Sequence, residues 1–176
     1  PPQSKNLRYE SDGKFDRRFS NYRHGMLTLA FMYQMTEDDR YAQKAFEFAE
    51  AICDLPRWII EAHEFNIIYD RVWPWNAINS DDQVVFNYDI RTGDVASEMG
   101  MAYDWLYPAL SKKQRDRIRG ALLENAILLA RNHYDYHWWA TSYKCNWNGI
   151  CFAGLGISAM ALLIEDPSLI DVVRET

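Results

Sequence analysis

The sequence predicts an all-α fold built of about three helix hairpins in series. Two observations support this prediction. Apolar residues recur with the 3.6-residue period of a helix through most of the chain. In addition, one unit occurs three times: an apolar helix, a short polar break and an amphipathic helix. The 176 residues, of which 48% are hydrophobic, fall within the usual size of one domain with a buried core.

The first hairpin is predicted over residues 16–55. A polar break from Thr36 to Asp39 separates its two helices, and Pro56 ends the unit because proline cannot continue a helix. Each helix carries apolar residues on one face at helical spacing. The first face consists of Phe19, Tyr22, Met26, Leu29, Ala30 and Tyr33, and the second of Tyr41, Ala45, Phe48, Ala49 and Ile52.

The second hairpin is predicted over residues 94–132. Pro108 ends its first helix, and Ser111 followed by Gln114 is typical of a capping box that opens the second. The apolar faces again have helical spacing. They consist of Val95, Met99, Ala102, Tyr103 and Leu106 in the first helix, and of Ile118, Leu122, Ala126 and Leu129 in the second.

The third hairpin is predicted over residues 149–176. The segment from Ile150 to Ile164 is apolar nearly all round, so we expect it to be buried on most sides. Asp166 and Pro167 provide an N-cap followed by proline at the first helical position. Gly149, Gly154 and Gly156 are explained most simply by close contact between helices.

In each hairpin the first helix is more apolar than the second, which predicts an inner and an outer layer. A solenoid and a closed toroid both have this pattern. The connections 57–93 and 131–148 are long and rich in aromatic residues, whereas solenoids have short turns. We therefore predict an incomplete (α/α) toroid with these loops at one mouth. Because three hairpins do not close a ring, further chain or another copy is expected to complete it.

Composition excludes several classes of function. The net charge of −6 argues against a nucleic-acid partner, which needs a broad basic surface. No segment is long and apolar enough to span a membrane. The three cysteines lack zinc-site spacing, and Cys53 and Cys151 lie in apolar stretches where burial is expected. No phosphate-binding glycine loop or nucleophile elbow is present, so we expect no cofactor.

The aromatic segment 133–139 is the first candidate for a functional site. Its His, Asp and Tyr residues, His137 among them, offer acid/base groups, and Trp138 and Trp139 offer rings that stack on sugars. Alternatively, the segment fills the interior of the domain with aromatic side chains. A metal site formed by His133, Asp135 and His137 is a further alternative.

The segment 143–149 is the second candidate. Asn146 and Asn148 precede the most apolar helix, and asparagine is a preferred N-cap. A helix start also attracts anions through its unpaired N–H groups and its dipole. An asparagine amide there is suited to hydrogen-bond the carboxyl group of a uronic acid. The two interpretations, capping and substrate binding, stay open at this point.

The segment 87–94 is the third candidate. Arg91 is suited to pair with a carboxylate or sulfate, or it is a solvated loop charge. Asp94 is expected to cap the helix that begins at Val95. Asp89, Asp94 and Asp104 are alternatively the source of the two carboxylates of a glycoside hydrolase. Asp104 is otherwise expected to anchor a loop through hydrogen bonds.

Three segments resemble the N-terminal domain of heparinase II/III-like polysaccharide lyases. They are residues 18–22 with 55–58, residues 92–94 with 103–107 and 110–111, and residues 146–151 with 154–156. The third segment is the most specific of the three: Asn146 to Cys151 reads NWNGIC, followed by GLG from Gly154 to Gly156. The segments occur in the family's order and span most of the chain.

The resemblance implies an (α/α) toroid joined to a downstream β-sandwich, acting on an acidic, uronate-containing polysaccharide by β-elimination. It assigns carboxylate neutralisation to Asn146 and Asn148. The His that follows this asparagine in several relatives is replaced here by Trp147 and Asn148. The family's catalytic Tyr lies on a later helix, beyond this chain. The expected partners are therefore the polysaccharide and the remainder of the same polypeptide.

We further expect Arg91, His137, Trp138, Trp139, Tyr143 and Trp147 to contact substrate. No metal is expected in the site, and the protein is expected to be periplasmic or secreted. Two other classes of function stay open besides the lyase. One is an (α/α) glycoside hydrolase and the other is a glycan-binding helical segment without catalysis. A related epimerase uses the same proton abstraction.

Overall fold

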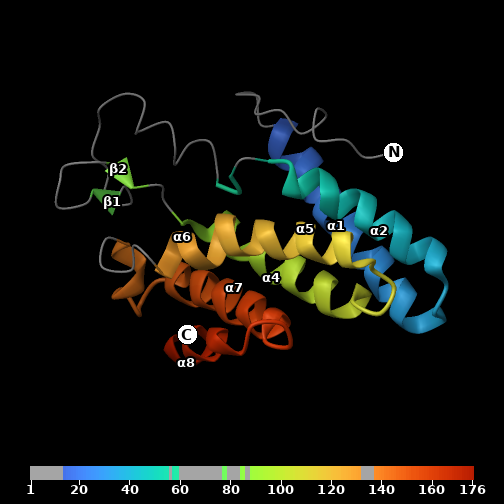
Figure 1. Cartoon of the computed structure of the whole chain (residues 1–176). Coiled ribbons are helices and arrows are strands. Elements are labelled where there is room, and N and C mark those ends of the chain that lie inside the picture. Colours follow the sequence, from blue (N-terminus) through green and yellow to red (C-terminus); the bar gives the residue numbers. More distant parts are fainter. Residues whose placement is uncertain (1–13, 56, 60–76, 79–83, 86–87, 132–136) are drawn as a thin grey trace.

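The computed structural model describes residues 14–55, 57–59, 77–78, 84–85, 88–131 and 137–176. These residues form an all-α structure whose helices pack together, which confirms the predicted fold class (Figure 1). The principal helices are α1 (Lys14–Thr36), α2 (Asp39–Cys53), α4 (Ile90–Leu106), α5 (Lys112–Leu122), α6 (Leu128–Arg131), α7 (Asn146–Leu162) and α8 (Ile170–Glu175). Within the predicted loop 57–93, the two-residue strands β1 (Ala77–Ile78) and β2 (Val84–Val85) pair antiparallel.

The helices α1, α4 and α7 run parallel to one another. At one end of the α1–α4 contact Arg23 pairs with Glu98, and further along Gln34 donates a hydrogen bond to the carbonyl oxygen of Trp105. The α4–α7 contact brings Gly93 against Cys151 and, seven residues later in both helices, Gly100 against Ser158. Parallel first helices are the arrangement that the repeated hairpins predict for an inner layer.

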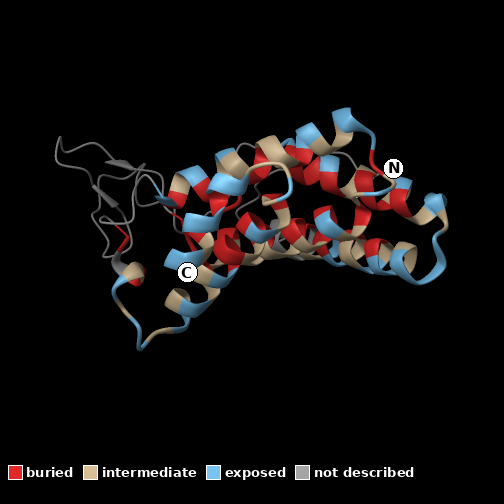
Figure 2. Ribbon diagram, turned by 60° about the horizontal axis from the view of Figure 1, so that its bottom comes forward, coloured by how far each residue is buried: buried red, intermediate tan, exposed pale blue. Residues whose placement is uncertain are grey.

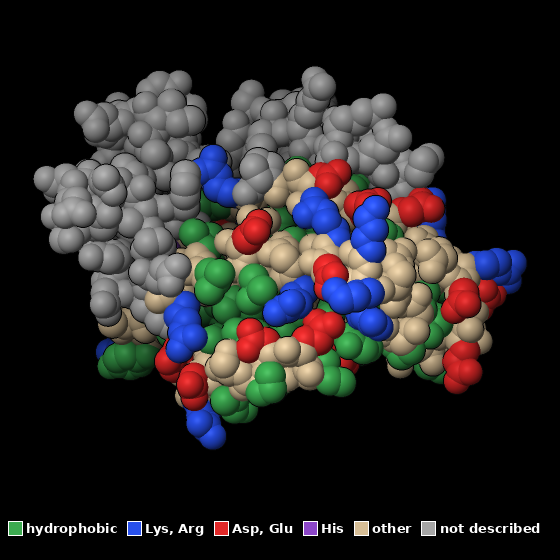
Figure 3. Space-filling model, in the orientation of Figure 1, with side chains coloured by type: hydrophobic (Ala, Val, Ile, Leu, Met, Phe, Trp, Pro, Cys, Tyr) green, Lys and Arg blue, Asp and Glu red, His purple; other side chains and the backbone are tan. Residues whose placement is uncertain are grey.

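The second helices of the first two hairpins also lie side by side. Gln114 on α5 donates to the side-chain oxygen of Gln43 on α2 at 3.3 Å, and Arg117 forms an ion pair of 2.8 Å with Asp54. The buried residues lie between these helices and the first layer (Figure 2). Acidic and basic side chains are interspersed over the face shown in Figure 3, where no continuous basic surface is seen.

Short turns join the helices within each hairpin, with caps close to those expected. Asp38 caps α2 by accepting a hydrogen bond from the backbone N–H of Arg40. Ser111 and Gln114 form the predicted capping box at the start of α5. Asp166 caps the 3₁₀ turn η5 (Pro167–Leu169), with proline at its first position as predicted.

The predicted outer helix of the second hairpin forms, but it contains a π-helical turn, η2 (Leu123–Ile127), between α5 and α6. A π turn adds one residue per turn and therefore shifts the buried face. Ile118, Leu122 and Ala126 are buried as expected, but after the turn the core side passes to Ile127 and Ala130. Leu129, which we expected in the core, is half-buried against it.

Two predicted boundaries are displaced toward the N-terminus. Helix α4 begins at Ile90 rather than at 94, because Asp89 is the N-cap and accepts hydrogen bonds from the backbone N–H and hydroxyl of Thr92. The prediction that Asp94 caps this helix is therefore wrong. Helix α7 begins at Asn146 rather than at 149, so the last residues of both predicted loops are helical.

The prediction that α7 is buried on most sides is wrong for one face. Cys151, Gly154, Leu155 and Ser158 are buried against its neighbours, whereas Met160 is 51% exposed and Ile164, just beyond the helix end, is 74% exposed. Nothing among the described residues covers this face. No helix in the described part of the chain is long and apolar enough to cross a membrane.

Candidate functional site

The N-terminal ends of α4 and α7 lie at the same end of the layer formed by α1, α4 and α7, and the 3₁₀ turn η4 (Trp138–Ala140) packs on them. The C-terminal ends of the two long predicted loops, 57–93 and 131–148, therefore lie together at the starts of α4 and α7. Trp139 donates its indole N–H to the carbonyl oxygen of Tyr88 at 2.6 Å. The hydroxyl of Tyr88 in turn donates to the carbonyl oxygen of Cys151 at 3.4 Å. These contacts join the ends of both loops to the two helices.

Aromatic rings fill the space behind η4. The rings of His137 and Trp139 stack with centroids 5.1 Å apart and an interplanar angle of 16°. Tyr88 and Phe152 each contact the Trp139 ring, at 5.6 Å and 5.3 Å between centroids. His137 is 2% exposed and Trp139 is fully buried. Of the two interpretations of this segment, the structure supports the one in which its aromatic residues fill the interior.

Burial has a direct consequence for the predicted sugar contacts. A sugar stacks on a ring only where one face of the ring is open to it. The rings of His137 and Trp139 have no such face, so the prediction that they contact substrate is wrong for this structure. The side chain of Trp138, and residues His133 and Asp135 of the alternative metal site, lie outside the described residues. Among the described residues no cluster is suited to hold a metal ion.

Asn148 is held by the same packing. Its amide nitrogen donates to the carbonyl oxygens of Trp139 at 3.0 Å and of Ala140 at 3.2 Å. The amide N–H groups therefore fix η4 to the third position of α7 and leave the amide oxygen, an acceptor, for other partners. A carboxylate needs a donor. The prediction that Asn148 neutralises a substrate carboxylate does not fit this geometry, and Asn148 is a positioning residue.

Asn146 occupies the first position of α7 and is exposed. The N-cap is Cys145, whose side chain makes no capping hydrogen bond, and the first turn carries no acidic residue. The expectation that Asn146 or Asn148 caps this helix is therefore wrong. Cys145 thus gives the first turn no side-chain cap, and a helix start without such a cap is suited to bind an anion.

Tyr143 and Lys144 precede this helix start in an exposed turn. Tyr143 is 78% exposed, and the ammonium nitrogen of Lys144 lies 5.7 Å from the centre of its ring. Both side chains are accessible to a ligand from solvent. Trp147, by contrast, is half-buried and packs against the core. Of the residues predicted here, the structure therefore leaves Tyr143 and Asn146 most open to a substrate.

Arg91 lies on the other side of this end, toward α1. Its guanidinium carbon is 5.9 Å from the centre of the Phe19 ring, and the side chain is half-buried. The guanidinium of Arg23 lies over the same ring and forms a two-pronged ion pair with Glu98, with nitrogen–oxygen distances of 2.5 and 2.7 Å. Arg91 is helical and faces α1, so the structure does not bring it together with Asn146.

Asp94 is 3.7 Å from Arg23 and belongs to the same charged contact. Its partial burial raises the pKa of its carboxyl group above the ordinary value of 3.8, because desolvation outweighs the attraction of Arg23. Asp89 is fully buried as the N-cap of α4. Asp104 lies ten residues beyond Asp94 on the same helix, a rise of about 15 Å.

Paired hydrolase carboxylates lie about 5 to 9.5 Å apart. Asp94 and Asp104 are too distant along α4 to form such a pair, and Asp89 is committed to capping. The described carboxylates therefore give little support to the hydrolase alternative. The side chain of Asp104 makes no hydrogen bond with any described residue, so the expectation that it anchors a loop is wrong as well.

The cysteines behave as predicted from their apolar surroundings. Cys53 and Cys151 are buried, and desolvation raises the pKa of the Cys53 thiol to about 12 and that of Cys151 well above its ordinary value. A thiol that stays protonated is a poor nucleophile and a poor metal ligand. Both residues therefore serve as small core residues.

Sequence reasoning did not identify the contacts by which two tyrosines organise the two ends of α4. Tyr88 is fully buried at the aromatic end, and its only sequence signal is its position directly before the N-cap Asp89. At the opposite end the hydroxyl of Tyr103 donates to Glu165 at 2.6 Å. Burial and this hydrogen bond raise the pKa of Tyr103 far above its usual range, so Tyr103 is unsuited to act as a base.

A comparison with models of known protein families finds no match to this chain. A comparison with curated proteins likewise finds no significant match.

Proposed function

We propose that this chain forms the uronate-binding part of a polysaccharide lyase that cleaves acidic polysaccharides by β-elimination. The observation that carries the proposal is the uncapped start of α7. There the exposed amide of Asn146, the helix start that Cys145 leaves without a side-chain cap and the nearby cation Lys144 present hydrogen-bond donors and positive charge without an acidic residue in the first turn. The resemblance of residues 146–156 to heparinase II/III-like lyases supports the same assignment.

The chemistry explains why such donors are useful. A base removes the proton at C5 of the uronate, the electron pair forms the C4–C5 double bond, and the C4–oxygen bond breaks as the leaving oxygen takes a proton. Negative charge gathers on the carboxyl group as the C5 proton leaves. Donors fixed at that group stabilise the intermediate more than the ground state, which accelerates proton removal.

The described residues contribute binding and orientation rather than the base. Tyr103, which is buried and hydrogen-bonded to Glu165, is unsuited to the role. The resemblance places the catalytic Tyr on a later helix of the ring. Asn148 supports the site indirectly, because its bonds to the carbonyls of Trp139 and Ala140 fix η4 beside the helix start.

We propose in addition that the three hairpins belong to an (α/α) toroid. The parallel order of α1, α4 and α7 supports a ring in which each inner helix packs on the one before it. The exposed face in the first half of α7, formed by Gly149 and Ala153, continues this order. It consists of small and apolar residues, as does the α4–α7 contact, and is suited to receive the inner helix of a further hairpin.

The test uses the natural full-length protein and uronate-containing polysaccharides, with the ultraviolet absorbance of unsaturated uronate as the readout. Asn146→Ala is expected to lower kcat by about 10²-fold, because removing a hydrogen-bond donor from a developing oxyanion has an effect of this size. Asn148→Ala is expected to lower activity less and to reduce thermal stability. Asn125→Ala, on the outer layer, is the matched control and should leave the rate unchanged.

Three outcomes would contradict the proposal. Products without a double bond would select the hydrolase. Tight binding of the polysaccharide without turnover would select a non-catalytic glycan-binding segment. Unchanged rates in both Asn146→Ala and Asn148→Ala would remove the role of the α7 start, even if the protein proved to be a lyase.

A further inference from the structure

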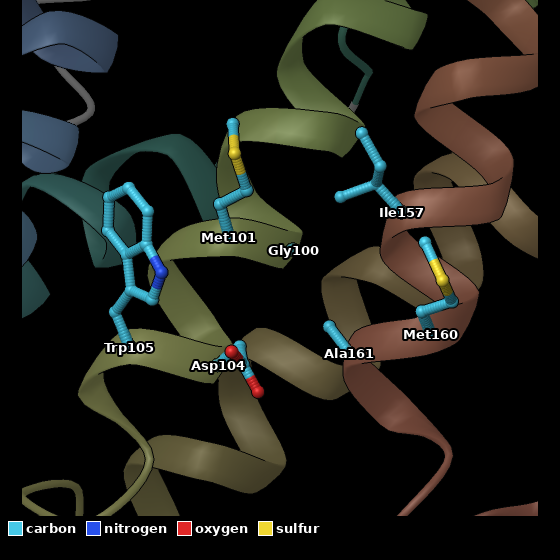
Figure 4. A pocket seen from close by; sticks show the side chains of 7 residues that line it. All are labelled: Gly100, Met101, Asp104, Trp105, Ile157, Met160 and Ala161. Carbon is cyan, nitrogen blue, oxygen red and sulfur yellow. The ribbon is translucent and has the colours of Figure 1, made fainter.

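A pocket lies between α4 and α7, nearer to the ends of these helices that are remote from η4. Its volume is about 210 Å³, and it is open to solvent. Figure 4 shows the side chains that line it. They are Gly100, Met101, Asp104 and Trp105 from α4, and Ile157, Met160 and Ala161 from α7 and its end.

Two polar groups at this pocket have no hydrogen-bond partner among the described residues. One is the carboxylate of Asp104, which is exposed and accepts hydrogen bonds. The other is the indole N–H of Trp105, which donates. In Figure 4 the indole nitrogen lies on the edge of the ring that faces Met101 and Asp104. The pocket therefore presents an acceptor and a donor side by side.

The Trp105 ring is held from the opposite side. Phe31 on α1 contacts it with ring centroids 6.1 Å apart, and Gln34 donates a hydrogen bond to its backbone carbonyl oxygen. These contacts come from α1, whereas the pocket lies toward α7. The indole is thus positioned before any ligand arrives, which lowers the entropy lost on binding.

The remaining walls are apolar and shallow. Met101, Ile157 and Met160 supply flexible or branched apolar side chains, and Gly100 and Ala161 leave room between the helices. A pyranose ring matches this arrangement, because its hydroxyl groups both donate and accept and its C–H face is apolar. Of the seven lining residues, Asp104 is the charged one. Its negative charge disfavours a uronate or a sulfated sugar.

We propose that this pocket binds a neutral pyranose. The proposal rests on the proposed lyase function for its biological context, because a polymer held at the α7 start would have to extend along this helix to reach the pocket. The carboxylate of Asp104 accepts from a sugar hydroxyl, and the indole of Trp105 donates to a second oxygen. The two ends of α7 thereby discriminate between charged and neutral sugars.

The experiment is a calorimetric or ligand-observed NMR titration of the full chain with three probes. The probes are the methyl glycoside of N-acetylglucosamine, the methyl glycoside of glucuronic acid, and choline. We expect saturable binding of the neutral glycoside. Asp104→Asn is expected to weaken it about tenfold, because a hydrogen bond to a charged acceptor is lost. Trp105→Phe keeps an aromatic ring but removes the donor, and is expected to weaken binding several-fold.

Asp39→Asn, which removes an exposed carboxylate on α2, is the matched control and should leave the affinity unchanged. Each of three results would overturn the proposal. They are absence of saturation by the neutral glycoside, equal affinity for the glucuronide, and unchanged affinity in both pocket variants. Choline binding that is tighter than neutral-sugar binding and lost in Asp104→Asn would reassign the pocket to a cation.

The result is separable from that of the lyase test. Binding of the neutral glycoside without formation of unsaturated product would retain the pocket and reject the lyase. Formation of unsaturated product with no neutral-sugar binding at Asp104 and Trp105 would retain the lyase and reject the pocket.

Discussion

Helix α4 contacts its two inner neighbours by different means. Toward α7 it presents Gly93 and Gly100, so that the two backbones touch. Toward α1 it presents Glu98 and Asp94, which hold the largely buried Arg23 between the helices. The first contact depends on the absence of side-chain atoms and the second on matched charges. The comparison predicts that the glycine contact tolerates no added atom, whereas the charged contact tolerates exchange of both partners together.

The largest effect is expected from Gly154→Ala. A Cβ atom there would lie 2.6 Å from the Cα of Gly93 and closer still to its carbonyl oxygen, so the helices must separate. We expect the free energy of unfolding to fall by about 3 kcal/mol or more, seen as a fall in Tm of roughly 10 °C. Gly149→Ala is the control, because nothing lies within 4 Å of its added Cβ. A small rise in Tm is expected there, since alanine favours the helix.

If Gly154→Ala were tolerated as well as Gly149→Ala, the close approach of α4 and α7 would be refuted. Amide hydrogen exchange in both helices would show whether the loss is local to this contact.

Arg23→Met should have the next largest effect. It leaves Glu98, whose side chain is 15% exposed, without its cation. Removing one member of a buried pair leaves an uncompensated charge. We therefore expect the free energy of unfolding, measured by chemical denaturation, to fall by about 2 kcal/mol. The double variant Arg23→Met with Glu98→Leu should recover most of this loss, because both charges are then absent. A double variant that is less stable than Arg23→Met would contradict the matched-charge interpretation of this contact.

Trp139→Phe tests the aromatic packing above the glycine contact. The variant keeps a ring in the core but leaves the carbonyl oxygen of Tyr88 without the indole donor. The expected loss is about 1–2 kcal/mol, with increased hydrogen exchange at the starts of α4 and α7. The same variant should not alter the α1–α4 contact, which can be checked by combining it with Arg23→Met. Independent sites should give additive losses.

The smallest effect is expected from Asp94→Asn, and it depends on pH. Because folding raises the pKa of Asp94, the folded state binds this proton more tightly than the unfolded state. The ionised carboxylate therefore costs stability once pH exceeds the folded pKa, and the cost disappears below the ordinary value of 3.8. We expect Asp94→Asn to raise Tm by about 1 °C at pH 7, a small value because the group is half-exposed. At pH 3 we expect Asp94→Asn and the unmodified protein to have the same Tm.

Glu98→Gln should lower Tm at pH 7, in contrast to Asp94→Asn, since Glu98 is the closer partner of Arg23. A larger stabilisation by Glu98→Gln than by Asp94→Asn would show that the ion pair has been assigned to the wrong carboxylate.

Much of the fold followed from local patterns. The apolar face of Val95, Met99, Ala102, Tyr103 and Leu106 is buried in full, because a single period of 3.6 residues decides which side of a helix meets the core. The capping box at Ser111 and the proline start at Asp166 were predictable for the same reason, since each involves residues only a few positions apart.

The candidate site was predictable to a lesser degree. The segment 143–149 was identified, and Asn146 does lie exposed at a helix start. Its neighbours were assigned less well, because whether His137 and Trp139 line a cleft or fill the interior depends on what lies behind them. Tyr88 and Phe152, distant in sequence, occupy that position and bury the rings. Likewise, the donors of Asn148 are engaged by a turn eight and nine residues earlier.

The sequence by itself determined the helices, the caps at Ser111 and Asp166 and the order of hairpins, because these depend on residues within one or two turns of each other. The tertiary structure alone decided how α4 meets its neighbours. Gly93, Gly100 and Arg23 are ordinary in a helical pattern, and their roles appear only when α1, α4 and α7 lie parallel in one layer. The physical reason is that close packing and ion pairing act between segments whose distance in space is not encoded in local periodicity.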